Sequence, residues 1–79
     1  MSTDEPLNVV AEWDAGPLGC SALVAGICAR IGTLAPGDVL KVIARDSAAS
    51  FDIPAWCRLT GHRLARAAHP EYFVQRKKE

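Results

Sequence analysis

The sequence has no net charge, because nine acidic residues balance nine basic ones over 79 positions. It therefore lacks the basic excess with which nucleic-acid-binding and membrane-surface proteins attract their partners. No apolar run approaches the ~20 residues that a membrane-spanning helix needs. The polar, acidic start is unlike a signal peptide. We expect a cytoplasmic protein with no membrane contact and no direct nucleic-acid partner.

Cysteine is scarce, and no two cysteines are close together. The chain has Cys20, Cys28 and Cys57, with no Cys-x-x-C, and neither His62 nor His69 stands at zinc-ligand spacing from paired cysteines. An odd number of widely spaced cysteines argues against a disulfide framework and fits a reducing compartment. We expect no metal and no cofactor, and we interpret both histidines as hydrogen-bonded structural residues.

Hydrophobic periodicity predicts six elements after a flexible leader over residues 1–8. The expected strands cover residues 9–13, 39–45, 62–68 and 72–76, and the expected helices cover residues 20–34 and 50–60. The order β-α-β-α-β-β predicts one α+β domain over residues 9–79. This domain is a two-layer α/β sandwich, with a mixed four-stranded sheet and two helices on one face. Parallel neighbours are expected around each helix, and an antiparallel hairpin at the end.

Glycine and proline give further local expectations. Gly26 lowers helix propensity by roughly 1 kcal/mol relative to alanine, so it predicts a close contact with a neighbouring element. Gly61 fits the position just past the second helix. Ser50 or Asp52 is the expected cap of that helix, with Pro54 in its first turn. Val39 and Ile43 are expected on the sheet face away from the helices.

Cys20 stands where the turn-rich stretch over residues 14–19 gives way to the first helical pattern. A helix N-terminus presents unpaired N–H groups and the positive end of the helix dipole, which favour a thiolate. The alternative interpretation of Cys20 is a small apolar residue at a helix start. Cys28 and Cys57 lie on apolar helix faces and are expected to pack in the core. Asp14 is expected to accept N–H bonds from the turn.

These features together resemble the TusA/SirA-like family of small sulfur-carrier proteins. The matching residues are Trp13-Asp14-Ala15, Leu18-x-Cys20, Leu34-x-Pro36-Gly37-Asp38-x-Leu40-x-Val42, Asp52-Ile53-Pro54-x-Trp56-Cys57, Gly61-His62-x-Leu64 and Tyr72-Phe73-x-x-x-Lys77. The resemblance implies persulfide relay by a sulfurtransferase or persulfide carrier. Cys20, the catalytic residue, would take sulfane sulfur from a donor such as a cysteine desulfurase or a rhodanese. It would then pass that sulfur to an acceptor sulfurtransferase in tRNA thiolation, molybdenum-cofactor maturation or sulfur oxidation.

The chain departs from the family pattern at the motif itself. Family members usually carry Cys-Pro-x-Pro preceded by glycine, whereas this chain has Ser21 and Leu23 at the proline positions and Pro17 at the glycine position. Because of this departure, a second interpretation stays open, in which the chain is a non-catalytic binding or regulatory module with the same fold. A third possibility is RNA binding through a basic cluster formed by Arg58, Arg63 and Arg66.

Overall fold

The computed structural model describes residues 9–78, except for the side chain of Cys20, so the leader predicted over residues 1–8 lies outside the described residues. Six elements follow one another in the predicted order. They are β1 (Val9–Gly16), α1 (Cys20–Ile31), β2 (Val39–Ala44), α2 (Ala49–Thr60), β3 (Arg63–Ala68) and β4 (Glu71–Gln75). Every predicted element is therefore present, with shifts of a few residues at the ends.

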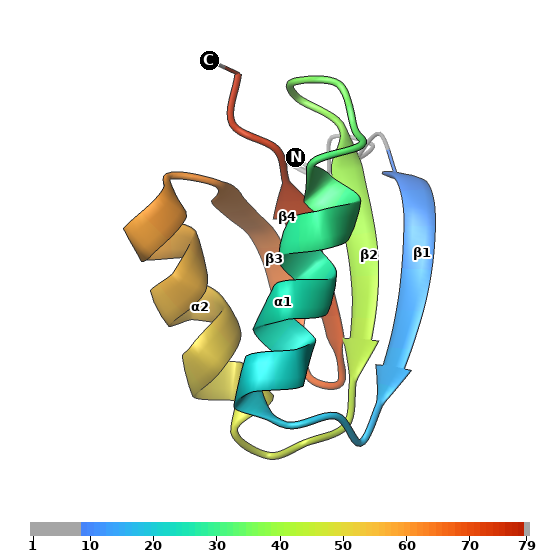
Figure 1. The fold of residues 1–79 in the computed structure, drawn as a ribbon, viewed down its shortest axis with the longest axis vertical. Coiled ribbons are helices and arrows are strands. Elements are labelled where there is room, and N and C mark those ends of the chain that lie inside the picture. Colours follow the sequence, from blue (N-terminus) through green and yellow to red (C-terminus); the bar gives the residue numbers. More distant parts are fainter. Residues whose placement is uncertain (1–8, 79) are drawn as a thin grey trace, which may run out of the picture.

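The four strands form one mixed sheet in the order β1-β2-β4-β3, and both helices lie on one face of it (Figure 1). Strand β1 pairs parallel to β2, while β4 is antiparallel to both β2 and β3. The predicted α+β two-layer sandwich is confirmed. The expectation that the strands around α2 are neighbours is wrong, because β4 lies between β2 and β3.

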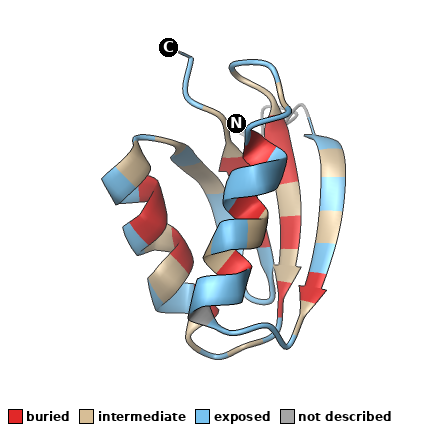
Figure 2. Ribbon diagram, in the orientation of Figure 1, coloured by how far each residue is buried: buried red, intermediate tan, exposed pale blue. Residues whose placement is uncertain are grey.

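The core lies between the helices and the sheet, where red segments of α1, α2 and β2 face one another in Figure 2. Alternate residues of β2, Leu40, Val42 and Ala44, are fully buried against the helices. Val39 is also only 1% exposed, so its predicted place on an open sheet face is wrong. In the described part of the chain, neither helix has the length and apolarity to cross a bilayer.

Helix α1 ends at Ile31 and not at the predicted Leu34. Arg76, far away in the sequence, donates from Nη1 to the carbonyl oxygens of Ile31, Gly32 and Leu34. The Ile31 carbonyl is in the last turn of α1, where carbonyls lack intrahelical partners, and the other two belong to the turn that follows the helix. A side chain from the end of the chain therefore satisfies the end of α1.

Helix α2 begins one residue earlier than predicted, and neither Ser50 nor Asp52 caps it. The N-cap is Ala48, whose N–H donates to Oδ2 of Asp46 at 3.1 Å. Pro54 is consequently the sixth residue of α2, beyond the first turn where it was expected. A proline there has no N–H for the carbonyl of Ser50 four residues back. Ser50 is exposed, so water can reach its backbone.

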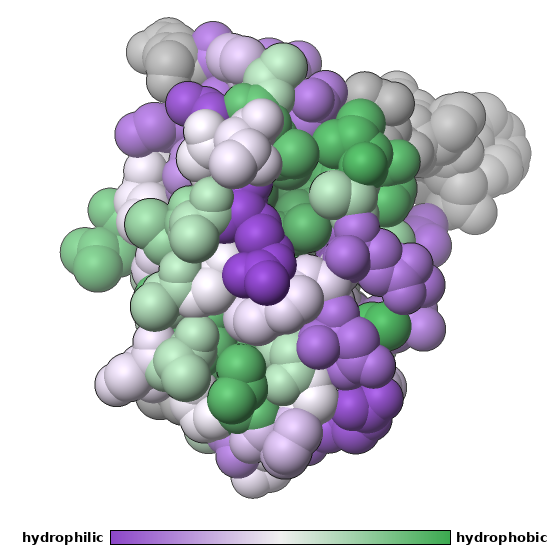
Figure 3. All heavy atoms as spheres, turned by 45° about the vertical axis from the view of Figure 1, so that its right-hand side comes forward, coloured by the Kyte–Doolittle hydropathy of each residue, from purple (hydrophilic) through white to green (hydrophobic). Residues whose placement is uncertain are grey.

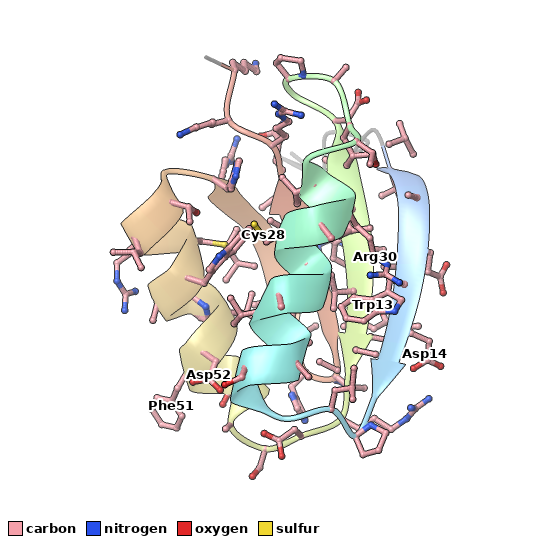
Figure 4. The ribbon with its side chains drawn as sticks, viewed as in Figure 1. Trp13, Asp14, Cys28, Arg30, Phe51 and Asp52 are labelled. Atoms are coloured by element: carbon pink, nitrogen blue, oxygen red, sulfur yellow. The ribbon has the colours of Figure 1, made fainter. Side chains whose placement is uncertain are left out.

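Gly26 makes the close contact that its sequence position predicts. A Cβ atom at this position would overlap three ring carbons of Trp13, which packs from β1 against α1. Arg30, one turn further along α1, places its guanidinium 4.0 Å from the centroid of the Trp13 ring (Figure 4). The indole thus contacts both the backbone of α1 at Gly26 and the cation of Arg30.

Replacing Gly26 with alanine tests this contact. The new methyl group has to displace the Trp13 ring, so we expect the free energy of unfolding to fall by about 1–3 kcal/mol. Gly32→Ala is the matched control, because Gly32 has helical φ and ψ angles and an added Cβ there meets only ordinary contacts. Urea denaturation should show Gly32→Ala at least as stable as the parent. Equal stability of the two variants would contradict the contact.

Candidate functional site

The candidate site lies at the end of the fold where α1 and α2 both begin. Strands β1 and β2 run parallel, and each leads through a short loop into a helix, so the two helix starts lie at the same end of the molecule (Figure 1). Cys20 is the first residue of α1, as the sequence predicts. The chemistry available here is set by the loop before Cys20, by the helix start and by the groups that face it.

Asp14 and Arg45 tie the loop before α1 to the end of β2. Asp14 accepts the backbone N–H of Gly16 at 2.9 Å, which confirms its predicted role in the turn. Both carboxylate oxygens also accept from Arg45, each at 3.1 Å, and the backbone N–H of Arg45 donates to the Gly16 carbonyl. The Arg45 hydrogen bond, followed by the Gly16 N–H, lowers the pKa of Asp14. The sequence did not predict that Arg45 pairs with Asp14, because no residue near Arg45 in the sequence indicates a partner 31 positions away.

The β1 edge of the molecule begins with the exposed apolar residues Val9 and Val10 and becomes polar further along the strand. Figure 3 brings this edge forward and shows hydrophilic side chains along it. The exposed charged residues of β1 and the end of β2 are Glu12, Asp14 and Arg45. Strand β1 pairs only with β2, so its other edge is unpaired in the described part of the chain. Charged side chains on such an edge discourage pairing with another strand.

The first turn of α1 leaves its backbone donors without a side-chain cap. The N-cap is Gly19, in an extended conformation, and the first turn contains no acidic residue. The first N–H groups of a helix have no intrahelical acceptor, and together they carry about half a positive charge. The start of α1 therefore has the electrostatics of an anion site, at the residue where the sequence places a thiol.

Leu23 explains how the helix starts without the prolines of the family pattern. Its backbone N–H donates to the Gly19 carbonyl at 2.8 Å, a bond that proline at this position cannot make. Its side chain is fully buried in the core. Ser21, at the other proline position, is exposed and contributes a further backbone N–H to the helix start. The two replacements thus preserve the helix start by a different set of contacts.

The other two cysteines have different environments. Cys57 is buried on α2, as predicted, and burial raises the pKa of its thiol to about 11, an effect that nearby Arg58 partly opposes. Cys28 is exposed, so the prediction that it packs in the core is wrong (Figure 4). The buried stripe of α1 runs through Leu23, Ile27 and Ile31, and Cys28 is rotated about 100° from Ile27, beyond that stripe.

Both histidines have structural hydrogen bonds, which confirms their interpretation. His62 accepts the backbone N–H of Lys77 at 3.0 Å and stacks on Trp56 with 5.2 Å between ring centroids. Nδ1 of His69 lies 2.5 Å from the Tyr72 hydroxyl. Within residues 9–78, no group of three or more His, Cys, Asp or Glu residues could hold a metal ion.

The arginines that cluster in the sequence do not form one surface. Arg58 lies on the exposed side of α2, in the helical layer. Arg63 and Arg66 pair across the sheet with Gln75 and Phe73, which alternate with the buried Val74 and so face away from the helices. The geometry therefore gives no single basic patch to support the RNA-binding alternative.

Asp52 is the polar residue of this end that sequence reasoning did not place in the site. It belongs to the first turn of α2, on the side toward the start of α1 (Figure 4). Its Oδ2 atom is buried and has no hydrogen-bond partner. An acidic residue near a helix start predicts an N-cap. The structure does not have Asp52 in that role, because the N-cap of α2 is Ala48.

Comparison with known proteins gives a consistent result. Residues 12–75 match the family model described as Sulfurtransferase TusA. A protein of Pseudomonas syringae pv. syringae named Sulfur carrier protein TusA is 35% identical, over 95% of this chain and 94% of its own length. Proteins with the same name from Pseudomonas aeruginosa (strain LESB58) and Pseudomonas fluorescens are 42% and 39% identical. The matched regions cover 72% and 81% of this chain, and 72% and 77% of the two relatives' own lengths, respectively.

Restoring the two prolines one at a time tests the account of the helix start. Ser21→Pro should leave stability within about 0.5 kcal/mol, because proline is tolerated in the first turn, where its missing N–H has no intrahelical partner. Leu23→Pro should lose about 2–5 kcal/mol, because it removes a buried side chain together with the bond to Gly19. Thermal and urea denaturation measure both variants. Equal losses would contradict the assigned role of Leu23.

Proposed function

The chain belongs to the TusA sulfurtransferase family, and on that premise we propose that it is a sulfur carrier whose reactive group is the thiol of Cys20. In this proposal Cys20 takes sulfane sulfur from a donor protein and holds it as a persulfide. An acceptor protein then removes that sulfur. No metal or organic cofactor enters the scheme.

The observation that carries the proposal is the start of α1 at Cys20. A sulfur anion at the first position of a helix is stabilised by the dipole and by the free N–H groups of the first turn. The absence of an acidic residue from that turn leaves this stabilisation unopposed within α1. Neither Cys57, with its raised pKa, nor Cys28, in the third turn of α1, has this environment.

The transfer step balances without an oxidant or a reductant. The Cys20 thiolate attacks the outer sulfur of the donor's persulfide, and a new sulfur–sulfur bond forms. The bond between the donor's two sulfurs breaks, and its electron pair leaves on the donor's cysteine. Delivery repeats the exchange in the other direction, with Cys20 as the leaving thiolate.

The proposed donor is a cysteine desulfurase or a rhodanese, and the proposed acceptor is a further sulfurtransferase. The acceptor pathway would be tRNA thiolation, molybdenum-cofactor maturation or sulfur oxidation. The proposed compartment is the cytoplasm, whose reducing conditions keep the Cys20 thiol available between transfers.

The second candidate is a binding or regulatory module without sulfur relay. Leu18, in the loop before α1, is 39% exposed, and Phe51, in the first turn of α2, is 78% exposed. Exposed apolar side chains on both sides of the helix start fit a protein-binding surface. The replacement of both family prolines also favours this candidate, since it changes the frame that a sulfur donor meets.

A loading experiment with cysteine variants separates the two candidates. The protein is incubated with a cysteine desulfurase and cysteine, and its intact mass is measured. We expect the parent and Cys28→Ser to gain the mass of one sulfur atom, and Cys20→Ser to gain none. Reducing the product with dithiothreitol should restore the original mass, because a persulfide is reducible.

Two outcomes would contradict sulfur relay. One is a parent protein that gains no sulfur from either a desulfurase or a polysulfide. The other is a Cys20→Ser variant that loads as well as the parent. In both cases, if pull-down with the chain's cellular partners is unchanged in Cys20→Ser, the binding module becomes the better account.

A further inference from the structure

A bulge in β3 brings two arginines onto the same face of the sheet. Arg63 and Arg66 are three residues apart, and in a regular strand such residues point to opposite faces. Here Arg63 pairs across the sheet with Gln75 and Arg66 pairs with Phe73, because the register shifts between Leu64 and Arg66. Gln75 and Phe73 are two residues apart on β4, so both arginines lie at neighbouring positions on the open face, meaning the sheet face away from the helices. Bulges often re-aim a side chain where a sheet has a function.

The ring of Phe73 lies between cations from both neighbouring strands. The Cζ atom of Arg66 is 5.7 Å from the centroid of this ring, and the Nζ atom of Lys41 is 5.8 Å from it. Contact with an aromatic ring positions a cation and leaves its charge and its hydrogen-bond donors in place. The carboxylate of β4 belongs to Glu71, which lies 3.9 Å from Lys41. The β3 side of the open face is therefore positively charged.

The outer edge of β3 is open to a further strand. In the sheet order β1-β2-β4-β3 this strand comes last, so nothing in the described part of the chain pairs with its outer side (Figure 1). Ala67 and Ala68 are exposed there, and their side chains are too small to block an approaching backbone. Unpaired N–H and C=O groups on such an edge can bind the backbone of an extended segment.

Charge determines which segment fits this edge. A second copy of β3, added antiparallel, would bring arginines close to arginines, and like charges across strands are destabilising. The β1 strand of a second copy offers Glu12, but Asp14 on the same face is already bound by Arg45. A segment with acidic residues at alternate positions has carboxylates about 7 Å apart on one face. This is also the spacing of the neighbouring strand positions occupied by Arg63 and Arg66.

We propose that the outer edge of β3 binds an extended acidic segment of a partner protein as a fifth strand, whose alternate carboxylates pair with Arg63 and Arg66. The backbone of β3 binds the segment, and the two guanidinium groups select its charge and register. A nucleic acid has no backbone that extends a sheet, and Glu12 and Glu71 on the open face repel its phosphates. The inference goes beyond sulfur relay, because Cys20 takes no part in it.

Binding of a labelled peptide tests this inference. The probe is an eight-residue peptide of alternating glutamate and valine, and fluorescence anisotropy measures its affinity for the full chain at low salt. Arg63→Gln and Arg66→Gln should each weaken binding about two- to fivefold. Arg58→Gln is the matched control, because it makes the same charge change on the exposed side of α2. It should change the affinity less than about 1.5-fold.

A second peptide separates strand addition from charge attraction alone. Proline at two of its valine positions keeps the charge but removes two backbone donors, so the affinity should fall at least about tenfold. A measurement that needs no substitution in the protein is amide hydrogen exchange, which the first peptide should slow in β3.

Four results would overturn the inference. The proline peptide binds as well as the first, Arg58→Gln weakens binding as much as Arg66→Gln, or the first peptide leaves exchange in β3 unchanged. The fourth is that another occupant takes the edge. Self-association of the chain that Arg66→Gln abolishes would assign the edge to a second copy, and tighter binding of oligouridylate than of the peptide would assign it to RNA.

Discussion

The position of α1 against β1 is the constraint on which the rest of the structure depends. Trp13 projects from β1 into the space that Gly26 leaves open, and the Arg30 guanidinium, which donates to the Gly26 carbonyl, lies over the ring. Leu23 and Ile27 add fully buried contacts on the same helix. Because protein interiors are close-packed, this contact fixes where the helix axis lies and therefore where its first turn begins. The electrostatics at Cys20 follow from that placement.

Two features determine the charge around the start of α1, namely the pairing of Asp14 and the N–H groups of the first turn. Arg45 and the Gly16 N–H neutralise Asp14, so this carboxylate holds the loop without adding a free negative charge beside the helix. The N–H groups of the first turn of α1 have no side-chain cap, and no acidic residue lies in that turn, so the helix start favours an anion.

The sequence predicts the architecture well because alternation and helical periodicity report burial directly. The alternation in β2 and the steps through Leu23, Ile27 and Ile31 mark faces that the structure buries. What local patterns cannot predict is contact between distant segments. The bonds from Arg76 that end α1 and the pairing of Arg45 with Asp14 both join residues more than 30 positions apart. The same limit explains Cys28, whose exposure depends on how widely the sheet covers α1.

The central claim is that the start of α1 makes Cys20 the reactive thiol of this chain. The most direct measurement is competitive alkylation of the native protein at neutral pH with less than one equivalent of iodoacetamide, followed by peptide mass spectrometry. Most of the label is expected on Cys20, although Cys28 is exposed. Little label is predicted on Cys57, whose pKa is raised to about 11. Equal or greater labelling of Cys28 would contradict the account, because exposure alone would then decide reactivity.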